Sequence, residues 1–156
     1  MIESLAIQMS TNLSNDPLAI TLFSEIATID QLARTRLSRA LPEGMELSHF
    51  AVLNHFAHMG GEKTPAQLAR MLHVTKGAMT NTVNRLSAAG FIHIRPDWDD
   101  ARRKWISISP AGQAARDRAV QAIDPVFTDI VRVLGHEKIR NLLPVIRELR
   151  SALIEP

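Results

Sequence analysis

The chain has no cysteine among its 156 residues, and this absence excludes disulfide bonds, thiolate metal sites and cysteine redox sensing. It suits a reducing compartment, and we expect a cytoplasmic protein. No apolar run approaches the roughly 18 residues that cross a bilayer. Residues 1–16 lack the basic start, the apolar stretch and the cleavage site of a signal peptide. These absences predict a protein without a membrane partner.

Motifs that identify common enzyme classes are also missing. There is no Gly-x-Ser-x-Gly, no glycine-rich loop that would bind phosphate and no His-Glu-x-x-His. The serine, histidine and aspartate residues do not occur at a spacing that indicates a catalytic triad. His55 and His58 stand three apart on one expected helix, a spacing that can share a metal, but no other ligand cluster accompanies them. We therefore expect neither an enzyme nor a cofactor nor a metal site.

Charge is unevenly distributed, although the net charge of the chain is only +2. From Glu62 to Lys104 there are eight basic and four acidic side chains, a net +4, which leaves −2 for the remainder. A basic middle segment between neutral-to-acidic arms is typical of a protein with one lobe that faces phosphate groups. Scattered surface lysine and arginine is the alternative explanation. Apolar residues make up 46% of the chain, which is enough for a core.

Long amphipathic helices are expected at both ends of the chain. Asp16-Pro17 begins the first, with an apolar stripe at three- and four-residue steps over 18–37. A second helix, with Ser48 as its expected cap, ends at Gly60-Gly61. After Ser109-Pro110 two more helices are expected, over 111–134 and 136–153. Pro125 and Pro144 fall inside them, and each is expected to kink or interrupt its helix.

The middle segment 64–109 combines two short helices with two strand-like runs. Thr64-Pro65-Ala66-Gln67 is a capping box that begins the first helix. Thr75 is the expected cap of the next, which runs to Ala89. Strand-like runs over 91–95 and 105–109 flank a charged loop and predict a β-hairpin. A helix, a turn, a second helix and a hairpin together form a winged helix-turn-helix.

The helix over 75–89 has one apolar seam, formed by Met79, Val83 and Leu86, and an opposite polar stripe. The helix contains no acidic residue, whereas a solvated helix face commonly carries Glu-Lys pairs. Amides, hydroxyls and cations are the groups that bind base edges and phosphates in the major groove. The residues predicted to face DNA are Thr75, Lys76, Gly77, Thr80, Asn81, Asn84 and Arg85. A solvated or protein-binding face is the alternative for this stripe.

The charged loop of the hairpin adds a second basic feature. An aspartate beside an arginine can hold the guanidinium extended, toward a narrow minor groove or a phosphate. A solvated turn with weak ion pairs is the alternative. The residues predicted to form the DNA-binding wing are Asp100, Arg102, Arg103 and Lys104.

Two strings, TPAQLARMLHVTKGAMTNTVNRLSAAGFI and DWDDARRKWISISPAG, resemble the MarR family of multiple-antibiotic-resistance-type regulators. The second follows the family's wing pattern, and the residues that match it are Asp100, Arg102, Ile106, Ile108, Ser109 and Gly112. Ser109 departs mildly from the pattern, because threonine is commoner there. The arm 1–15 is an addition, and the two alternatives for it are that its apolar residues pack on a partner or that it is disordered.

The resemblance implies a homodimeric transcription regulator, more often a repressor than an activator, whose outer helices interleave. The long apolar stripes support this, because a monomer of this size could hardly cover them. A two-fold dimer would place its recognition helices about 34 Å apart and would require a palindromic double-stranded operator. The family also implies a small-molecule effector pocket. Its candidate lining residues, chosen only by their positions on the first two expected helices, are Phe23, Ile26, Asp30, His49 and Leu53. Ordinary core or interface is the alternative for each of these residues.

We therefore predict a mainly α fold, a winged helix-turn-helix with a small β-hairpin wing and flanking dimerisation helices. The expected divisions are an arm (1–15), a first dimerisation helix (16–46), a winged helix-turn-helix DNA-binding domain (47–109) and C-terminal dimerisation helices (110–156). A winged-helix adaptor that binds only proteins is the alternative function, but it would show an apolar or acidic recognition face.

Overall fold

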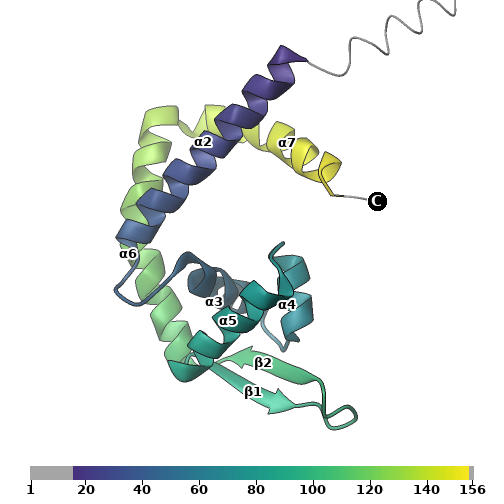
Figure 1. Ribbon diagram of the computed structural model, residues 1–156. Helices are drawn as coiled ribbons and strands as arrows, with labels where there is room; N and C mark the ends of the chain where they lie inside the picture. The colour runs from purple at the N-terminus through teal and green to yellow at the C-terminus, as the bar shows by residue number, and fades with distance from the viewer. Residues whose placement is uncertain (1–15, 155–156) are drawn as a thin grey trace, which may run out of the picture. The chain divides into compact units, whose positions relative to one another are not determined.

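The computed structural model describes residues 16–154, and the predicted arm 1–15 lies outside the described residues. Its elements follow in the order α2, α3, α4, α5, β1, β2, α6 and α7 (Figure 1). The chain divides into two compact units, one up to Arg39 and one from Ala40 onward. The predicted fold class, mainly helical with one β-hairpin, is confirmed.

Helix α2, Pro17–Ala40, begins where the side chain of Asp16 accepts the Leu18 backbone N–H at 2.9 Å. None of its residues is buried. Its large apolar side chains are exposed along much of its length, and they are Leu18, Ile20, Leu22, Phe23, Ile29 and Leu32. An apolar stripe of this length in water favours a covering partner.

The second unit is built on a core shared by α3 (Leu47–Met59), α4 (Pro65–Met71), α5 (Lys76–Ala88) and the hairpin. The largest fully buried side chains of this unit are Phe56, Leu53, Leu68, Leu86, Ile106 and Val52. The seam predicted for α5 is confirmed, because Met79, Val83 and Leu86 are all buried. Burying this seam orients the opposite stripe of α5 toward solvent.

Side-chain caps determine where the helices of this unit begin. Thr64 and Gln67 form the predicted capping box of α4, and the hydroxyl of Thr75 accepts the Ala78 backbone N–H at 3.2 Å. The prediction for α3 was wrong, because its cap is Glu46 and not Ser48. The Glu46 carboxylate accepts a backbone N–H in the first turn, and Ser48 lies one residue inside the helix.

The hairpin pairs β1 (Ile92–Pro96) with β2 (Lys104–Ile108) in antiparallel register, with Ile92 opposite Ile108 and Pro96 opposite Lys104. Lys63, just before α4, adds a short third segment by exchanging two backbone hydrogen bonds with Ile106, of 3.0 and 2.9 Å. These bonds attach the hairpin to the start of α4.

Helices α6 (Pro110–Leu134) and α7 (His136–Ala152) complete the unit. Ser109 caps α6 as predicted, by accepting the Gly112 backbone N–H at 3.0 Å. Both helices continue through Pro125 and Pro144, so the expected interruptions do not occur. The first half of α6 buries small and apolar residues and packs on α3, whereas no residue of α7 is buried. Over residues 16–154 no helix is long and apolar enough to cross a membrane.

Candidate nucleic-acid interface

The polar stripe of α5 faces solvent. All seven residues predicted from the sequence for this face are exposed: Thr75, Lys76, Gly77, Thr80, Asn81, Asn84 and Arg85. The hydroxyl of Thr80 donates to the Lys76 carbonyl at 2.9 Å, within the helix. The face therefore offers two amides, two hydroxyls and two cations, and α5 itself contributes no carboxylate.

Arg85 at the end of this stripe has an internal partner that the sequence did not indicate. Its guanidinium forms an ion pair with the carboxylate of Glu46, the cap of α3. Both side chains are about half exposed. Because the two residues are far apart in the sequence, no local pattern could have identified the pair.

The wing loop is organised by Asp97, a residue that the sequence analysis also missed. One carboxylate oxygen accepts the backbone N–H groups of Asp99, at 2.9 Å, and Asp100, at 3.4 Å. The other accepts the indole N–H of Trp105 at 2.8 Å and lies 3.8 Å from the Arg103 guanidinium. These donors hold the pKa of Asp97 below its usual range, the Asp99 N–H contributing most and the Trp105 indole next.

The four predicted wing residues lie together on this loop and the start of β2. Arg102 is held by Asp100, whose carboxylate oxygen accepts the Arg102 Nε–H at 3.1 Å and its backbone N–H at 3.1 Å. The side-chain bond from Arg102 is the main reason that the pKa of Asp100 is lowered. The Arg102 side chain nevertheless remains 92% exposed. The structure thus shows the expected contact between the aspartate and the arginine, and the role of Arg102 toward DNA stays a prediction.

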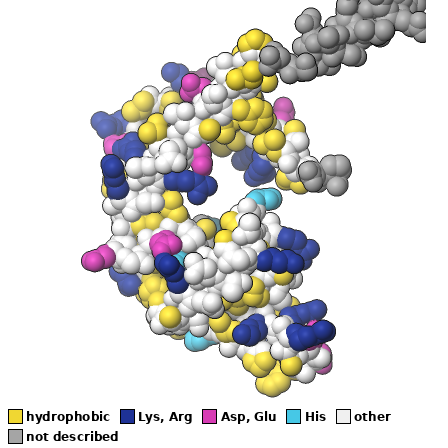
Figure 2. Space-filling view, viewed as in Figure 1, with side chains coloured by type: hydrophobic (Ala, Val, Ile, Leu, Met, Phe, Trp, Pro, Cys, Tyr) yellow, Lys and Arg dark blue, Asp and Glu magenta, His cyan; other side chains and the backbone are white. Residues whose placement is uncertain are grey.

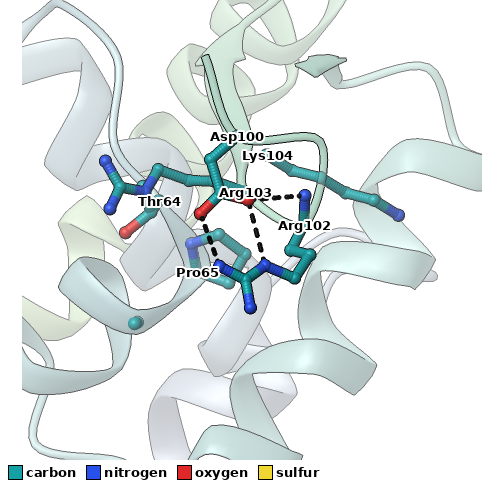
Figure 3. Close-up of a pocket in the computed structure, with 7 residues that line it drawn as sticks. Thr64, Pro65, Asp100, Arg102, Arg103 and Lys104 are labelled. Atoms are coloured by element: carbon teal, nitrogen blue, oxygen red, sulfur yellow. Dashed lines mark hydrogen bonds and ion pairs between the residues drawn. The ribbon is translucent and has the colours of Figure 1, made fainter. Parts of the chain in front are cut away.

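A shallow pocket of about 520 Å³ separates the wing from the start of α4 (Figure 3). Its lining combines Thr64, Pro65 and Ala66 with the four wing residues. In Figure 3 Arg102 reaches the carboxylate of Asp100, while Arg103 and Lys104 extend to opposite sides. Figure 2 shows lysine and arginine side chains on the side of α4, α5 and the hairpin, and further ones on the helices outside this part of the chain.

A second ion pair supports the base of the wing. Arg95 on β1 donates to both carboxylate oxygens of Glu62, at 2.8 and 2.5 Å, and its guanidinium lies 5.9 Å from the ring centroid of Trp105. The hydrogen bond from Arg95 is the main cause of a lowered pKa for Glu62. A bidentate pair restricts the geometry of both partners, so the hairpin is anchored on the segment before α4.

The five residues predicted for an effector pocket fall on two helices. Phe23, Ile26 and Asp30 lie on α2, where Asp30 accepts a hydrogen bond from Arg34 at 2.8 Å. His49 and Leu53 lie on α3 and are buried, with 7% and 0% exposed. Leu53 belongs to the core of the second unit. The effector role of all five stays a prediction.

The histidines of α3 have packing and capping roles in the structure. His49 Nδ1 accepts the Glu46 backbone N–H at 3.2 Å, which completes the capping box. His58 Nδ1 lies 2.8 Å from the Asn54 carbonyl oxygen. Within the described part of the chain no group of three potential metal-ligating side chains comes together.

Residues 43–103 match the model of a protein family described as the MarR family. The match includes α3, α4, α5, β1 and the wing loop, and it ends just before β2. No curated protein matches the chain by sequence.

Solved structures share the fold over most of the chain. A mutant of MarR from E. coli, complexed with operator DNA, superposes with a TM-score of 0.75 at 22% identity, over 84% of this chain and 94% of that chain. The PcaV transcriptional regulator from Streptomyces coelicolor, in complex with its natural ligand, gives 0.77 at 17% identity, over 91% and 100%. An organohalide-sensing transcriptional regulator in its 2,4-dichlorophenol-bound form gives 0.79 at 21% identity, over 90% and 83%.

Proposed function

We propose that this chain is a member of the MarR family, because its segment 43–103 matches the model of that family, and that it is a sequence-specific transcription regulator that binds double-stranded DNA. The family consists of transcription regulators, which are not enzymes. We propose that α5 enters the major groove and that the hairpin wing contacts the neighbouring backbone. In this assignment the DNA-binding domain is 47–109, and the protein acts in the cytoplasm.

The observation that carries this proposal is the composition of the exposed face of α5. Lys76 and Arg85 supply positive charge, and Thr80, Asn81 and Asn84 supply hydrogen-bonding groups at helical spacing. Asparagine pairs with adenine through two hydrogen bonds, and cations neutralise phosphates. A face for a protein partner would be expected to carry apolar or acidic side chains instead. The face therefore favours DNA over the adaptor function.

We further propose a homodimer that recognises a palindromic operator and represses transcription. Its support is the apolar surface outside the DNA-binding domain, on α2, α6 and α7. In the second half of α6 and along α7 the large apolar side chains are exposed, and they include Phe127, Ile130, Val133, Leu142, Leu143, Val145 and Ile146. Sedimentation equilibrium at micromolar concentration is expected to yield a dimer, and a stable folded monomer would contradict the proposal.

Regulation by a small-molecule effector is the remaining part of the proposal. It is supported by two structures of the same fold, one with a natural ligand and one with 2,4-dichlorophenol. In this chain, Phe23, Ile26, Asp30, His49 and Leu53 are the proposed effector-binding residues. We propose that the regulator has one conformation with high operator affinity and one with low operator affinity. An effector that binds one of them more tightly shifts the equilibrium toward it, and the operator affinity changes accordingly.

Fluorescence anisotropy tests the central proposal. The purified protein is titrated against the DNA upstream of its own gene and against a shuffled duplex, across a range of salt concentrations. Tight, selective binding with a steep salt dependence is expected. Weak and equal binding to both duplexes would contradict an operator at that place, and selection from a random duplex library would then locate it. No binding even at low salt would favour the adaptor function.

A further inference from the structure

Trp98 stands at the tip of the wing with 86% of its surface exposed, the highest value among the large exposed hydrophobic side chains of residues 16–154. We propose that Trp98 is a DNA-contacting residue whose indole packs against the deoxyribose edges of the groove that the wing enters. This inference rests on the proposed function and adds an apolar contact to an interface otherwise described by charge and hydrogen bonds.

The loop that carries Trp98 is held in one conformation. The carboxylate of Asp97, only 12% exposed, accepts hydrogen bonds from two backbone N–H groups that follow Trp98 and from the indole of Trp105. The Asp97 N–H donates to the Arg103 carbonyl at 3.0 Å, and the Arg103 N–H donates to the Asp100 carbonyl at 2.9 Å. Trp98 is therefore presented by a closed turn, and little backbone conformational entropy remains to be lost in this loop on binding.

The same turn presents the cations that would bring it to DNA. Arg102 is 92% exposed, and Arg103 and Lys104 are exposed beside it. Tryptophan and arginine are both enriched among the residues that dominate the affinity of protein–protein interfaces. Together with the exposed Lys76 and Arg85 of α5, these cations favour a polyanion as the partner, and duplex DNA is the polyanion that the exposed face of α5 suits.

The neighbouring charge indicates which part of DNA the indole would contact. Asp99, next to Trp98, is exposed, and a carboxylate there would be repelled by a phosphate. The sugar edges of a groove present C–H surface, which suits an indole. Other DNA-binding proteins place apolar side chains in the minor groove, where these insert between base steps. The sugar edge is thus the contact that fits both residues.

The test measures binding of wild type, Trp98→Ala and Trp98→Phe to a fluorescein-labelled random-sequence duplex at several salt concentrations. Met59→Ala, which removes an exposed apolar side chain from the end of α3, is the matched control. Trp98→Ala is expected to weaken binding about tenfold, the effect of losing roughly 60 Å² of buried apolar surface. The salt dependence should not change, because no charge is removed. Trp98→Phe should retain most of the affinity.

Intrinsic fluorescence supplies a second measurement. Wild type should show a DNA-induced change in tryptophan emission that is absent in Trp98→Phe, in which only the half-buried Trp105 remains. Selective, salt-dependent binding by wild type with equal affinity of Trp98→Ala would overturn this inference and leave the proposed function intact. A loss of affinity that comes with a reduced salt dependence would also overturn it, because displaced arginines would then be the cause. Absence of wild-type binding would remove the proposed function and the inference together.

Discussion

Arg85 of α5 and Glu46, the cap of α3, form an ion pair although 39 positions separate them in the sequence. The pair joins the end of the proposed recognition helix to the beginning of another helix of the same unit. In the free protein the Arg85 guanidinium is already bound by a carboxylate. DNA phosphate and Glu46 would therefore compete for the same cation.

Glu46→Gln is expected to strengthen binding to random-sequence DNA by about threefold, the scale of one exposed ion pair. The glutamine oxygen can still accept the capping hydrogen bond, so the melting temperature should change little. Releasing Arg85 should increase the salt dependence by up to about one unit. In an Arg85→Ala background the effect of Glu46→Gln should vanish in a double-mutant cycle. Weaker binding by Glu46→Gln alone would instead assign Glu46 the role of positioning Arg85.

Arg102→Ala should weaken binding to operator and random-sequence DNA to the same extent. Its side chain lies on the wing, is almost fully exposed and is predicted to contact phosphate or the minor groove. Anisotropy titrations across salt concentrations should show a slope reduced by about one. Arg118→Ala, at an exposed position on α6, is the matched control and should change neither quantity. Unchanged affinity of Arg102→Ala at physiological salt would contradict the role of the wing.

Asn81→Ala should relax sequence preference more than it lowers total affinity. Its amide is exposed on the predicted base-reading stripe, and a lost bidentate contact to a base costs about 1–3 kcal/mol of discrimination. Lys76→Ala, a cation one turn earlier, should instead weaken binding to all sequences uniformly. Selection from a random duplex library with each variant distinguishes the two effects. A uniform loss for Asn81→Ala would reassign it to the DNA backbone.

The wing should lose its order only in acid, because the pKa values of Asp97 and Asp100 are both lowered. Carboxylates with a lowered folded pKa contribute stability that is present above the unfolded pKa, about 3.9, and is lost as the pH falls through the folded value. The NMR signal of the Trp105 indole N–H should therefore stay constant from neutral pH to about pH 4 and change below it.

Asp97→Asn should change that indole signal already at neutral pH. The carboxylate accepts the backbone N–H groups with one oxygen and the indole N–H with the other, whereas an amide has only one acceptor oxygen. Asp99→Asn is the control, because Asp99 takes part in the turn through its backbone N–H, which the substitution leaves in place. An Asp97→Asn spectrum that matches wild type would show that Asp97 does not organise the wing.

Two glycines should respond in opposite ways to alanine. A Cβ on Gly112 would lie 2.0 Å from the Phe91 carbonyl oxygen, and the cost of such overpacking is about 2–3 kcal/mol in the free energy of unfolding. A Cβ on Gly77 meets nothing within 4 Å, so Gly77→Ala should stabilise α5 by up to about 1 kcal/mol. If the DNA backbone approaches Gly77 closely, the stabilised variant should also bind DNA more weakly. Thermal unfolding and anisotropy measure both effects.

Local patterns in the sequence predicted most of the helix starts and the hairpin. Caps such as Thr64, Thr75 and Ser109 act within three residues, and the apolar seam of α5 depends only on helical spacing. Helix α3 was the exception, since its capping box uses Glu46 and His49, which a search for serine and threonine does not find. Pro125 and Pro144 were expected to kink or interrupt their helices, and neither interrupts its helix.

By itself, the sequence determined the order of the elements, the polar stripe of α5 and the position of the wing arginines, because each depends on neighbours along the chain. Only the tertiary structure decided which charges are paired, as in Glu46 with Arg85 and Glu62 with Arg95. It also placed Lys63 beside Ile106 and presented Trp98 at the tip of a closed turn. The two ion pairs and the contact of Lys63 with Ile106 join residues that lie far apart in the sequence. The exposure of Trp98 depends on the turn that is held together by the Asp97 carboxylate. The free energy that selects them comes from packing of the whole unit, which no local pattern contains.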